Sequence, residues 1–239
     1  MKCKKTLGIV GGMGAYAGEF FFRLVTERTL AKKDSDHLDV IVSSLSSTPD
    51  RTQYIVGASC ENPVYHIQKS IDNLEKCGAE VIAIPCNTAM VYFDRFRMSD
   101  ELEVLNIIYQ AVNVVNHLKA SNVGILATDG TIRSKLYQNE CERNGISAVI
   151  PNDDEQHVIM HCIYDKLKLG NTKVNKIYQV FNSMLERCDL LILGCTELSM
   201  IDLSLYKNRD YIIDSSKALA KAAILSCNAI PCGFEPIYD

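Results

Sequence analysis

The chain has 239 residues, of which 47% are hydrophobic and 23% are charged, a composition typical of globular proteins. Its formal net charge of -4 provides no general positive field for nucleic acid or an anionic membrane, so we expect neither partner. Residues 7–10, the apolar stretch behind the basic start of the chain, are too short for a secretion signal or a membrane span. We therefore expect a cytoplasmic protein.

Strand and helix patterns alternate through the first half of the chain. The predicted strands are residues 6–10, 38–42, 81–84 and 103–108, and the predicted helices are residues 20–31 and 63–77. The first strand runs into a glycine-containing loop at residues 11–14. Strands that alternate with helices indicate a parallel sheet.

The second half repeats this order. Its predicted strands are residues 122–126, 147–150, 190–193 and 210–214, and its predicted helices are residues 131–144 and 155–169. Residues 122–131 match the start of the first half, and residues 190–197 match residues 81–88. These matches indicate an internal duplication.

The duplication predicts two similar α/β lobes, each with a central parallel sheet flanked by helices, related by a pseudo-twofold axis with a cleft between them. We assign residues 1–108 and 209–239 to the first lobe and residues 109–208 to the second. The last helix has no partner in its own lobe, so we expect it to cover the first. No linker rich in Pro, Gly or Ser separates the lobes, which favours a tight interface.

Each half places one cysteine directly after an apolar strand. These are Cys86 and Cys195, and in open α/β sheets ligands bind beyond the carboxyl ends of the strands. The polar residues that follow suit a helix N-terminus, which lowers a thiol pKa from about 8.5. No histidine adjoins either motif, which argues against a nucleophile with a histidine base. Two thiols on facing lobes suit removal of a proton from one face of a carbon and its return to the other, as in a racemase or epimerase.

The other chemical patterns are weaker. The ten cysteines include no Cys-x-x-Cys, and the remaining eight are interpreted as buried or incidental. Gly12, Gly14 and Gly18 match a dinucleotide loop only loosely and favour a small anion at a helix N-terminus. His157 and His161 lack the glutamate of a zinc-binding helix, so packing or surface histidines are favoured.

Two basic residues stay open on position alone. Arg51 follows a strand end and a turn, so it could reach the crevice or be a solvated loop residue. Lys168 lies near a helix C-terminus, where a cation is favourable for the helix dipole alone.

Five motifs, at residues 7–14, 49–52, 85–89, 126–132 and 194–197, together resemble the aspartate/glutamate racemase superfamily, most closely its cofactor-independent aspartate racemases. The resemblance implies two α/β lobes with the active site between them, usually in a homodimer, and neither pyridoxal phosphate nor a metal. It implies that Cys86 and Cys195 are the two catalytic cysteines.

The resemblance also implies a set of substrate-binding residues. Asn87, Thr88, Thr131 and Thr196 would bind the α-carboxylate and amino group. Arg51 would meet the side-chain carboxylate with the assistance of Lys168, which replaces the dipole explanation of that lysine. Met13 of the glycine loop and Glu197 complete the set. The expected reaction is the interconversion of L- and D-aspartate, with glutamate as the alternative substrate.

The clearest departure from the family is Met90, where members usually carry His after Pro-Cys-Asn-Thr-Ala. Tyr16 also stands in a loop where many relatives carry other residues. Two alternatives therefore remain open. One is a superfamily relative with another reaction, such as a maleate isomerase-like or decarboxylase-like enzyme or a broader amino-acid racemase. The other is a catalytically silent amino-acid-binding protein.

Overall fold

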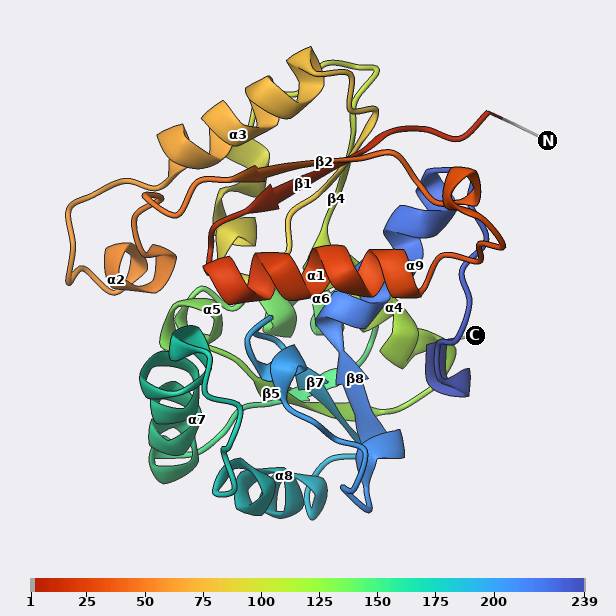
Figure 1. The fold of residues 1–239 in the computed structure, drawn as a ribbon. Helices are drawn as coiled ribbons and strands as arrows, with labels where there is room; N and C mark the ends of the chain where they lie inside the picture. The colour runs from red at the N-terminus through yellow and green to blue at the C-terminus, as the bar shows by residue number, and fades with distance from the viewer. Residues whose placement is uncertain (1–2, 239) are drawn as a thin grey trace.

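The structure, a computed structural model, describes residues 3–238. It contains two four-stranded parallel sheets with the orders β2-β1-β3-β4 and β6-β5-β7-β8. The two orders are equivalent, as a duplicated chain requires. In Figure 1 the two sheets lie one above the other and helix α1 crosses between them. The predicted two-lobed α/β fold is confirmed.

The elements of the first half are β1 (Leu7–Gly11), α1 (Ala15–Glu27), η1 (Asp34–Asp36), β2 (Val40–Ser44), α2 (Arg51–Ile55), α3 (Val64–Lys76), β3 (Val81–Ala83), η2 (Thr88–Arg95) and β4 (Glu103–Leu105). Those of the second half are α4 (Ile107–His117), β5 (Asn122–Leu126), α5 (Asp129–Arg133), α6 (Leu136–Arg143), β6 (Ser147–Val149), α7 (Asp153–Asp165), η3 (Leu167–Leu169), α8 (Ile177–Leu185), β7 (Leu190–Leu193), η4 (Leu198–Met200), η5 (Arg209–Tyr211), β8 (Ile212–Asp214), α9 (Ser215–Ser226) and η6 (Pro236–Tyr238). The η elements are short 3-10 helices.

The central strands are apolar and fully buried, as strands covered by helices on both faces must be. Parallel pairing sets Ile9 beside Ala83 and Leu126 beside Leu193. β3 therefore delivers Cys86, and β7 delivers Cys195, at the same end of each sheet as the loops that follow β1 and β5. This register gathers four motif-bearing loops at the junction of the lobes.

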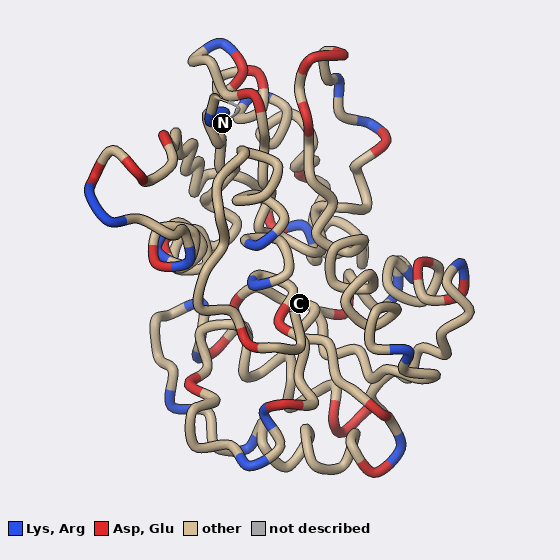
Figure 2. The backbone as a smooth tube through the Cα atoms, turned by 90° about the vertical axis from the view of Figure 1, so that its right-hand side faces the viewer, with Lys and Arg blue, Asp and Glu red and all other residues tan. Residues whose placement is uncertain are grey.

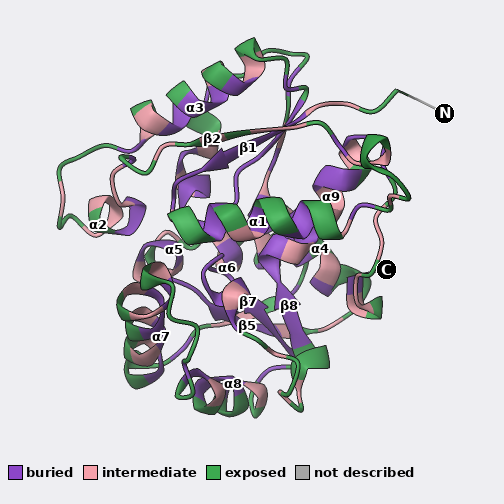
Figure 3. Cartoon of the chain, in the orientation of Figure 1, coloured by how far each residue is buried: buried purple, intermediate pink, exposed green. Residues whose placement is uncertain are grey.

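The hydrophobic core is continuous across the junction. One cluster of buried side chains joins Ile9 and Ile82 of the first sheet to Ile125 and Ile192 of the second. A smaller cluster fills the far side of the second sheet, beneath α7 and α8. Figure 3 shows strands β1, β7 and β8 buried, while exposed residues lie on the outer helices such as α3 and α8. The lobes thus share one interior.

The end of the chain differs from the predicted division, which gave residues 209–239 as a whole to the first lobe. Strand β8 pairs in parallel with β7, so it belongs to the second sheet. It completes that sheet as β4 completes the first. Helix α9 then returns to pack on α1, α4 and β3. The segment after the helix also lies against the first lobe, because the Leu30 N–H donates to the Ile230 carbonyl oxygen and the Cys232 N–H donates to the Arg28 carbonyl oxygen.

Several predicted helices also differ in detail. The pattern at residues 131–144 is split into α5 and α6 because Lys135 adopts a positive φ of 55°. The pattern at residues 155–169 begins earlier, at a capping box formed by Asn152 and Glu155, and ends in η3. Each cysteine motif leads into a short helix, and both of these helices, η2 and η4, are 3-10 helices.

The surface carries both signs of charge in alternation. In Figure 2 the acidic and basic residues are interspersed over the outer loops and helices of both lobes. Within residues 3–238, no helix combines the length and apolar character needed to cross a membrane.

Candidate active site

Both candidate cysteines line one pocket at the junction of the lobes. The space inside the pocket is about 290 Å³, with the solvent at its open mouth included. Cys86 and Cys195 are 5% and 6% exposed. The lining consists of Met13, Asp50, Arg51, Thr52, Cys86, Asn87, Thr88, Thr128, Tyr164, Lys168, Cys195, Thr196 and Glu197.

Arg51 is a buried residue of this pocket and not a solvated loop arginine. It opens helix α2, whose N-cap, Asp50, accepts a hydrogen bond from the Gln53 backbone N–H. The Arg51 guanidinium donates to the carbonyl oxygens of Pro49 at 2.9 Å and Met13 at 3.0 Å. Burial lowers the pKa of Arg51, but the negative forms of Cys86, Asp50 and Glu197 raise it, with a net upward shift. The fixed cation therefore lies close to the Cys86 sulfur.

The glycine loop after β1 brings backbone from the first lobe to a carboxylate of the second. Gly12 has a φ of +82°, and a Cβ there would lie 2.5 Å from the Leu45 carbonyl carbon, so this position requires glycine. The turn directs the Gly14 N–H to Glu197 Oε1 at 3.3 Å. In this structure the anion at the predicted anion-binding loop is Glu197.

Glu197 also controls the second cysteine. Its Oε2 accepts a hydrogen bond from Cys195 Sγ at 3.0 Å. Burial, followed by the Glu197 charge and this hydrogen bond, raises the pKa of Cys195 well above its ordinary value, although Lys168 opposes the shift. Cys195 is therefore held as a protonated thiol. The two cysteines occupy unlike environments, with a cation beside Cys86 and a carboxylate beside Cys195.

Threonine hydroxyls from both lobes meet in the wall of the pocket. Thr128 Oγ1 lies 3.0 Å from Thr52 Oγ1 and 3.1 Å from Thr88 Oγ1. Thr88 and Thr131 are 2.9 Å apart. Thr131 is fully buried and outside the pocket lining, so it supports Thr88 and Thr128 from behind, which differs from the expected substrate contact.

Lys168 is engaged in a contact between the lobes. Its Nζ donates to Asp50 Oδ2 at 2.9 Å and lies 3.6 Å from the centre of the Tyr164 ring. The Tyr164 hydroxyl donates to both Asp50 carboxylate oxygens at 3.1 Å. Burial lowers the pKa of Lys168, but Tyr164, Glu197 and Asp50 raise it further, so the ammonium stays charged. We call Asp50, Tyr164 and Lys168 the inter-lobe clasp.

Every substrate-binding or catalytic residue predicted from the sequence, apart from Thr131, lines the pocket. The pocket adds Asp50, Thr52, Thr128 and Tyr164, which the sequence did not single out. The first three adjoin predicted residues within the same motifs, and Tyr164 precedes Lys168 by four residues. That adjacency was the available signal.

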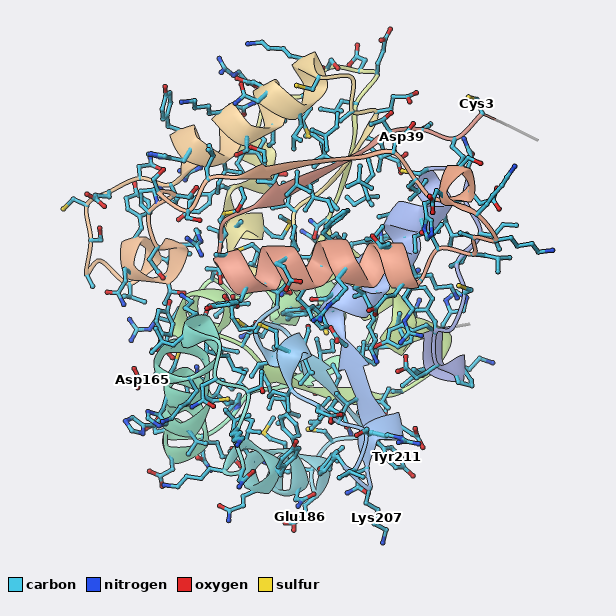
Figure 4. All side chains as sticks on the ribbon, viewed as in Figure 1. Cys3, Asp39, Asp165, Glu186, Lys207 and Tyr211 are labelled. Atoms are coloured by element: carbon cyan, nitrogen blue, oxygen red, sulfur yellow. The ribbon has the colours of Figure 1, made fainter. Side chains whose placement is uncertain are left out.

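Residues outside the pocket settle two other candidates. Met90 is 4% exposed, belongs to the larger core cluster and is not among the residues that line the pocket. His157 is exposed, and the exposed His161 pairs with Asp165 at 2.7 Å. Asp165 lies at the edge of the molecule in Figure 4. Within residues 3–238, no three His, Cys, Asp or Glu side chains gather as potential metal ligands.

Fold and site together define a two-lobed α/β protein with one buried thiol from each half of a duplicated chain in a common polar pocket. A sequence profile of the family described as Asp/Glu/Hydantoin racemase matches residues 10–223. The chain therefore belongs to the Asp/Glu/Hydantoin racemase family, and it is an isomerase of the racemase type.

Individual relatives agree with this assignment. The structure of Picrophilus torridus aspartate racemase has a TM-score of 0.87 and 30% identity, covering 98% of this chain and 99% of its own. The broad specificity amino-acid racemase RacX of Bacillus subtilis is 28% identical over 231 residues, which are 91% of this chain and 96% of RacX. An aspartate racemase homologue from Pyrococcus horikoshii, with 23% identity, a TM-score of 0.72 and coverage of 94% and 99%, shares the fold.

Proposed function

We propose that the protein interconverts the L- and D-isomers of an acidic amino acid, with aspartate as the leading substrate and glutamate as the alternative. The observation that carries the proposal is the presence of Cys86 and Cys195, one from each lobe, in a single small pocket with Arg51 and Lys168. The pocket supplies both proton-transfer groups and two cations, so the proposed reaction requires no pyridoxal phosphate or metal.

The unlike environments of the thiols give each a starting role. Cys86, which has the Arg51 cation beside it, is assigned the role of base for one isomer: as a thiolate it takes the α-proton and becomes a thiol. Cys195, held as a thiol, gives its proton to the opposite face of the α-carbon and becomes a thiolate. The substrate has then been inverted: one proton has passed from it to Cys86 and one has passed to it from Cys195, so the total number of protons is unchanged. The opposite isomer reacts in the reverse protonation state, with Cys195 as the thiolate and Cys86 as the thiol.

The negative charge that develops on the substrate needs fixed donors. After proton removal it is shared between the α-carbon and the α-carboxylate, where preorganised hydrogen bonds stabilise it. The Asn87 amide and the hydroxyls of Thr88 and Thr128 are the donors of the pocket wall. They are buried and held by other residues, so they need little reorganisation during the reaction.

The spare donors of Lys168, and not the net charge of the pocket, support an acidic substrate. Arg51 and Lys168 are balanced by Asp50 and Glu197, and the three N–H groups of Lys168 exceed the single bond made to Asp50. A side-chain carboxylate would take a further N–H. Broad specificity, as in the name of RacX, is the second candidate, favoured by the prior engagement of Lys168 with Asp50. The family resemblance also supports a cytoplasmic homodimer. The molecular mass from analytical ultracentrifugation would test whether the protein is a dimer.

The test is incubation of each isomer of aspartate, glutamate and a panel of neutral amino acids in heavy water. We expect incorporation of deuterium at the α-carbon together with the opposite isomer. Cys86→Ala and Cys195→Ala should each lose racemisation, while the remaining thiol still exchanges the proton of one isomer. Cys77→Ala, at an exposed cysteine, is the matched control.

Two outcomes would contradict the proposal. Absence of exchange with every amino acid would exclude racemisation, and normal turnover by both pocket variants would exclude the two-thiol mechanism. Saturable amino-acid binding without exchange would support a catalytically silent binding protein. The Met90→His variant would then test whether Met90 is responsible for the lack of exchange. The core position of Met90 leads us to expect little change from that variant.

A further inference from the structure

The side-chain amide of Asn87 is held by a hydrogen-bonded chain from the other half of the molecule. We propose that Tyr137 and Ser215 are positioning residues that orient this amide so that one N–H faces the substrate carboxylate. The inference rests on the proposed function and extends it to residues behind the pocket. Neither Tyr137 nor Ser215 lines the pocket.

The donor and acceptor of each hydrogen bond in this series can be assigned, starting from a backbone carbonyl oxygen. The Ser215 hydroxyl lies 2.7 Å from the Leu193 carbonyl oxygen, which only accepts, so Ser215 must donate to it. Ser215 Oγ is then an acceptor for the Asn87 group 3.2 Å away, which must be the NH₂. The carbonyl oxygen of the Asn87 amide consequently faces the Tyr137 hydroxyl, which donates to it at 2.6 Å.

This arrangement leaves Asn87 one unused N–H. An amide nitrogen carries two donors, and Ser215 takes one. Asn87 is 2% exposed and forms part of the pocket wall, so the second N–H can serve a ligand there. A flipped amide would instead present an oxygen and repel a carboxylate. The orientation of Asn87 therefore decides whether this wall attracts or rejects the acidic substrate.

Burial and packing hold the Tyr137 side chain in place. Its side chain is fully buried, and burial is the largest cause of the raised pKa of Tyr137, so its hydroxyl stays protonated as a donor. The ring packs under the second cysteine loop, where a Cβ on Gly194 would lie 2.8 Å from Tyr137 Cε2. The glycine before Cys195 makes room for the ring that holds Asn87.

The same chain fixes the two cysteine loops relative to each other. Asn87 follows Cys86, and through Ser215 it is tied to Leu193, two residues before Cys195. A second tie runs in the opposite sense, because Thr196 Oγ1 donates to the Pro85 carbonyl oxygen at 3.2 Å. The residues flanking each thiol are thus bonded to the segment that carries the other thiol.

The test compares Tyr137→Phe and Ser215→Ala with the parent protein. Phe keeps the ring and removes only the hydroxyl, so we expect the fold to persist. We expect an increase of about tenfold in KM for aspartate, and in the inhibition constant of succinate, for each variant. The double variant should resemble the singles because both act through one amide. Tyr206→Phe is the matched control, since Tyr206 donates a 2.7 Å hydrogen bond to Asn182 away from the pocket.

A second measurement does not depend on activity. In protein labelled with ¹⁵N-asparagine, the Asn87 side-chain amide, assigned by its absence in Asn87→Asp, should exchange slowly with solvent. Tyr137→Phe should speed this exchange by about tenfold or more. Unchanged exchange in Tyr137→Phe would overturn the inference.

The outcomes separate the two proposals. An active parent protein with an equally active Tyr137→Phe variant would overturn the positioning role and leave the proposed function intact. A lower kcat per total protein with KM unchanged would show a merely structural role and would also overturn it. A parent protein that exchanges no α-proton from any amino acid would overturn the proposed function itself.

Discussion

Replacement of Lys168 by methionine tests whether the inter-lobe clasp also contacts the side-chain carboxylate of the substrate. Methionine keeps much of the length and apolar character of the lysine stem and removes the charge. The lost contacts are the 2.9 Å bond to Asp50, the cation above Tyr164 and, in our proposal, one bond to the substrate carboxylate. The Asp50 carboxylate keeps its bonds from Tyr164 and the Gln53 N–H, so the clasp is weakened without leaving a bare buried charge.

The expected magnitude follows from the donor count. A hydrogen bond to a charged group contributes about 1.5–3 kcal/mol, which is roughly ten- to 150-fold in a rate or binding constant. Lys168 keeps its bond to Asp50 while it binds substrate, which shares its charge between two carboxylates. We therefore expect the lower figure, a loss of about tenfold in kcat/KM for aspartate. The clasp is partly exposed, so the loss of unfolding free energy should be about 1 kcal/mol or less.

The assay is the initial rate of isomer formation from aspartate and from a neutral amino acid of similar size. Lys173→Met, at an exposed lysine of the same lobe, is the control. The kcat/KM for aspartate should fall more than that for the neutral amino acid. Equal losses for both substrates would refute a contact between Lys168 and the side-chain carboxylate, and so would no loss at all.

Three further predictions concern the charges and the backbone of the site. Glu197→Gln should lower the pKa of Cys195, because the negative charge of Glu197 is removed while the thiol stays buried. The thiolate absorbance, assigned to Cys195 by subtraction of the Cys195→Ala spectrum, should then appear at lower pH. An unchanged titration would mean that burial alone sets this pKa. Burial raises the pKa of Asp50, but Lys168 and the Gln53 N–H lower it further, to a net value below 3.8. Asp50 therefore stabilises the fold fully above pH 3.8 and less as the pH falls through its folded pKa. The unfolding free energy, measured with urea, should fall less steeply with decreasing pH for Asp50→Asn than for the parent protein. Equal slopes of unfolding free energy against pH would contradict this. Gly12→Ala should reduce the unfolding free energy by about 2 kcal/mol or more, because a positive φ and contact with Leu45 backbone both oppose a side chain; a loss within 0.5 kcal/mol, roughly the range of neutral surface changes, would refute the close contact.

The fold was predictable because its signals are local and repeated. Buried parallel strands read as apolar runs, and the duplicated runs before Cys86 and Cys195 indicated equivalent sheets. The repeat also placed the strand at residues 210–214 in the second half, but the assignment of residues 209–239 to the first lobe moved it out of its sheet. The assignment went wrong because the strand and the helix after it belong to different lobes: β8 pairs with β7, whereas α9 packs on α1 and β3.

The site was predictable where a motif carries its residues and not where the partner comes from the other half of the chain. Position alone left Arg51 undecided between the crevice and a solvated loop, and only the family resemblance placed Arg51 and Lys168 at the substrate. It did not show that Asp50 joins Lys168, that Glu197 reaches Gly14, or that Tyr137 holds Asn87. These pairs are separated by between 50 and 183 residues, and they depend on how the two lobes meet.

The position two residues after each cysteine breaks the internal symmetry, since Thr88 follows Cys86 and Glu197 follows Cys195. Mirror-image substrates have equal free energies in water, so the equilibrium constant of a racemase is one. The ratio of kcat/KM for the two directions must then also equal one, however unequal the thiols are. The asymmetry introduced by Glu197 can change kcat and KM separately for each isomer, but it cannot bias the final mixture.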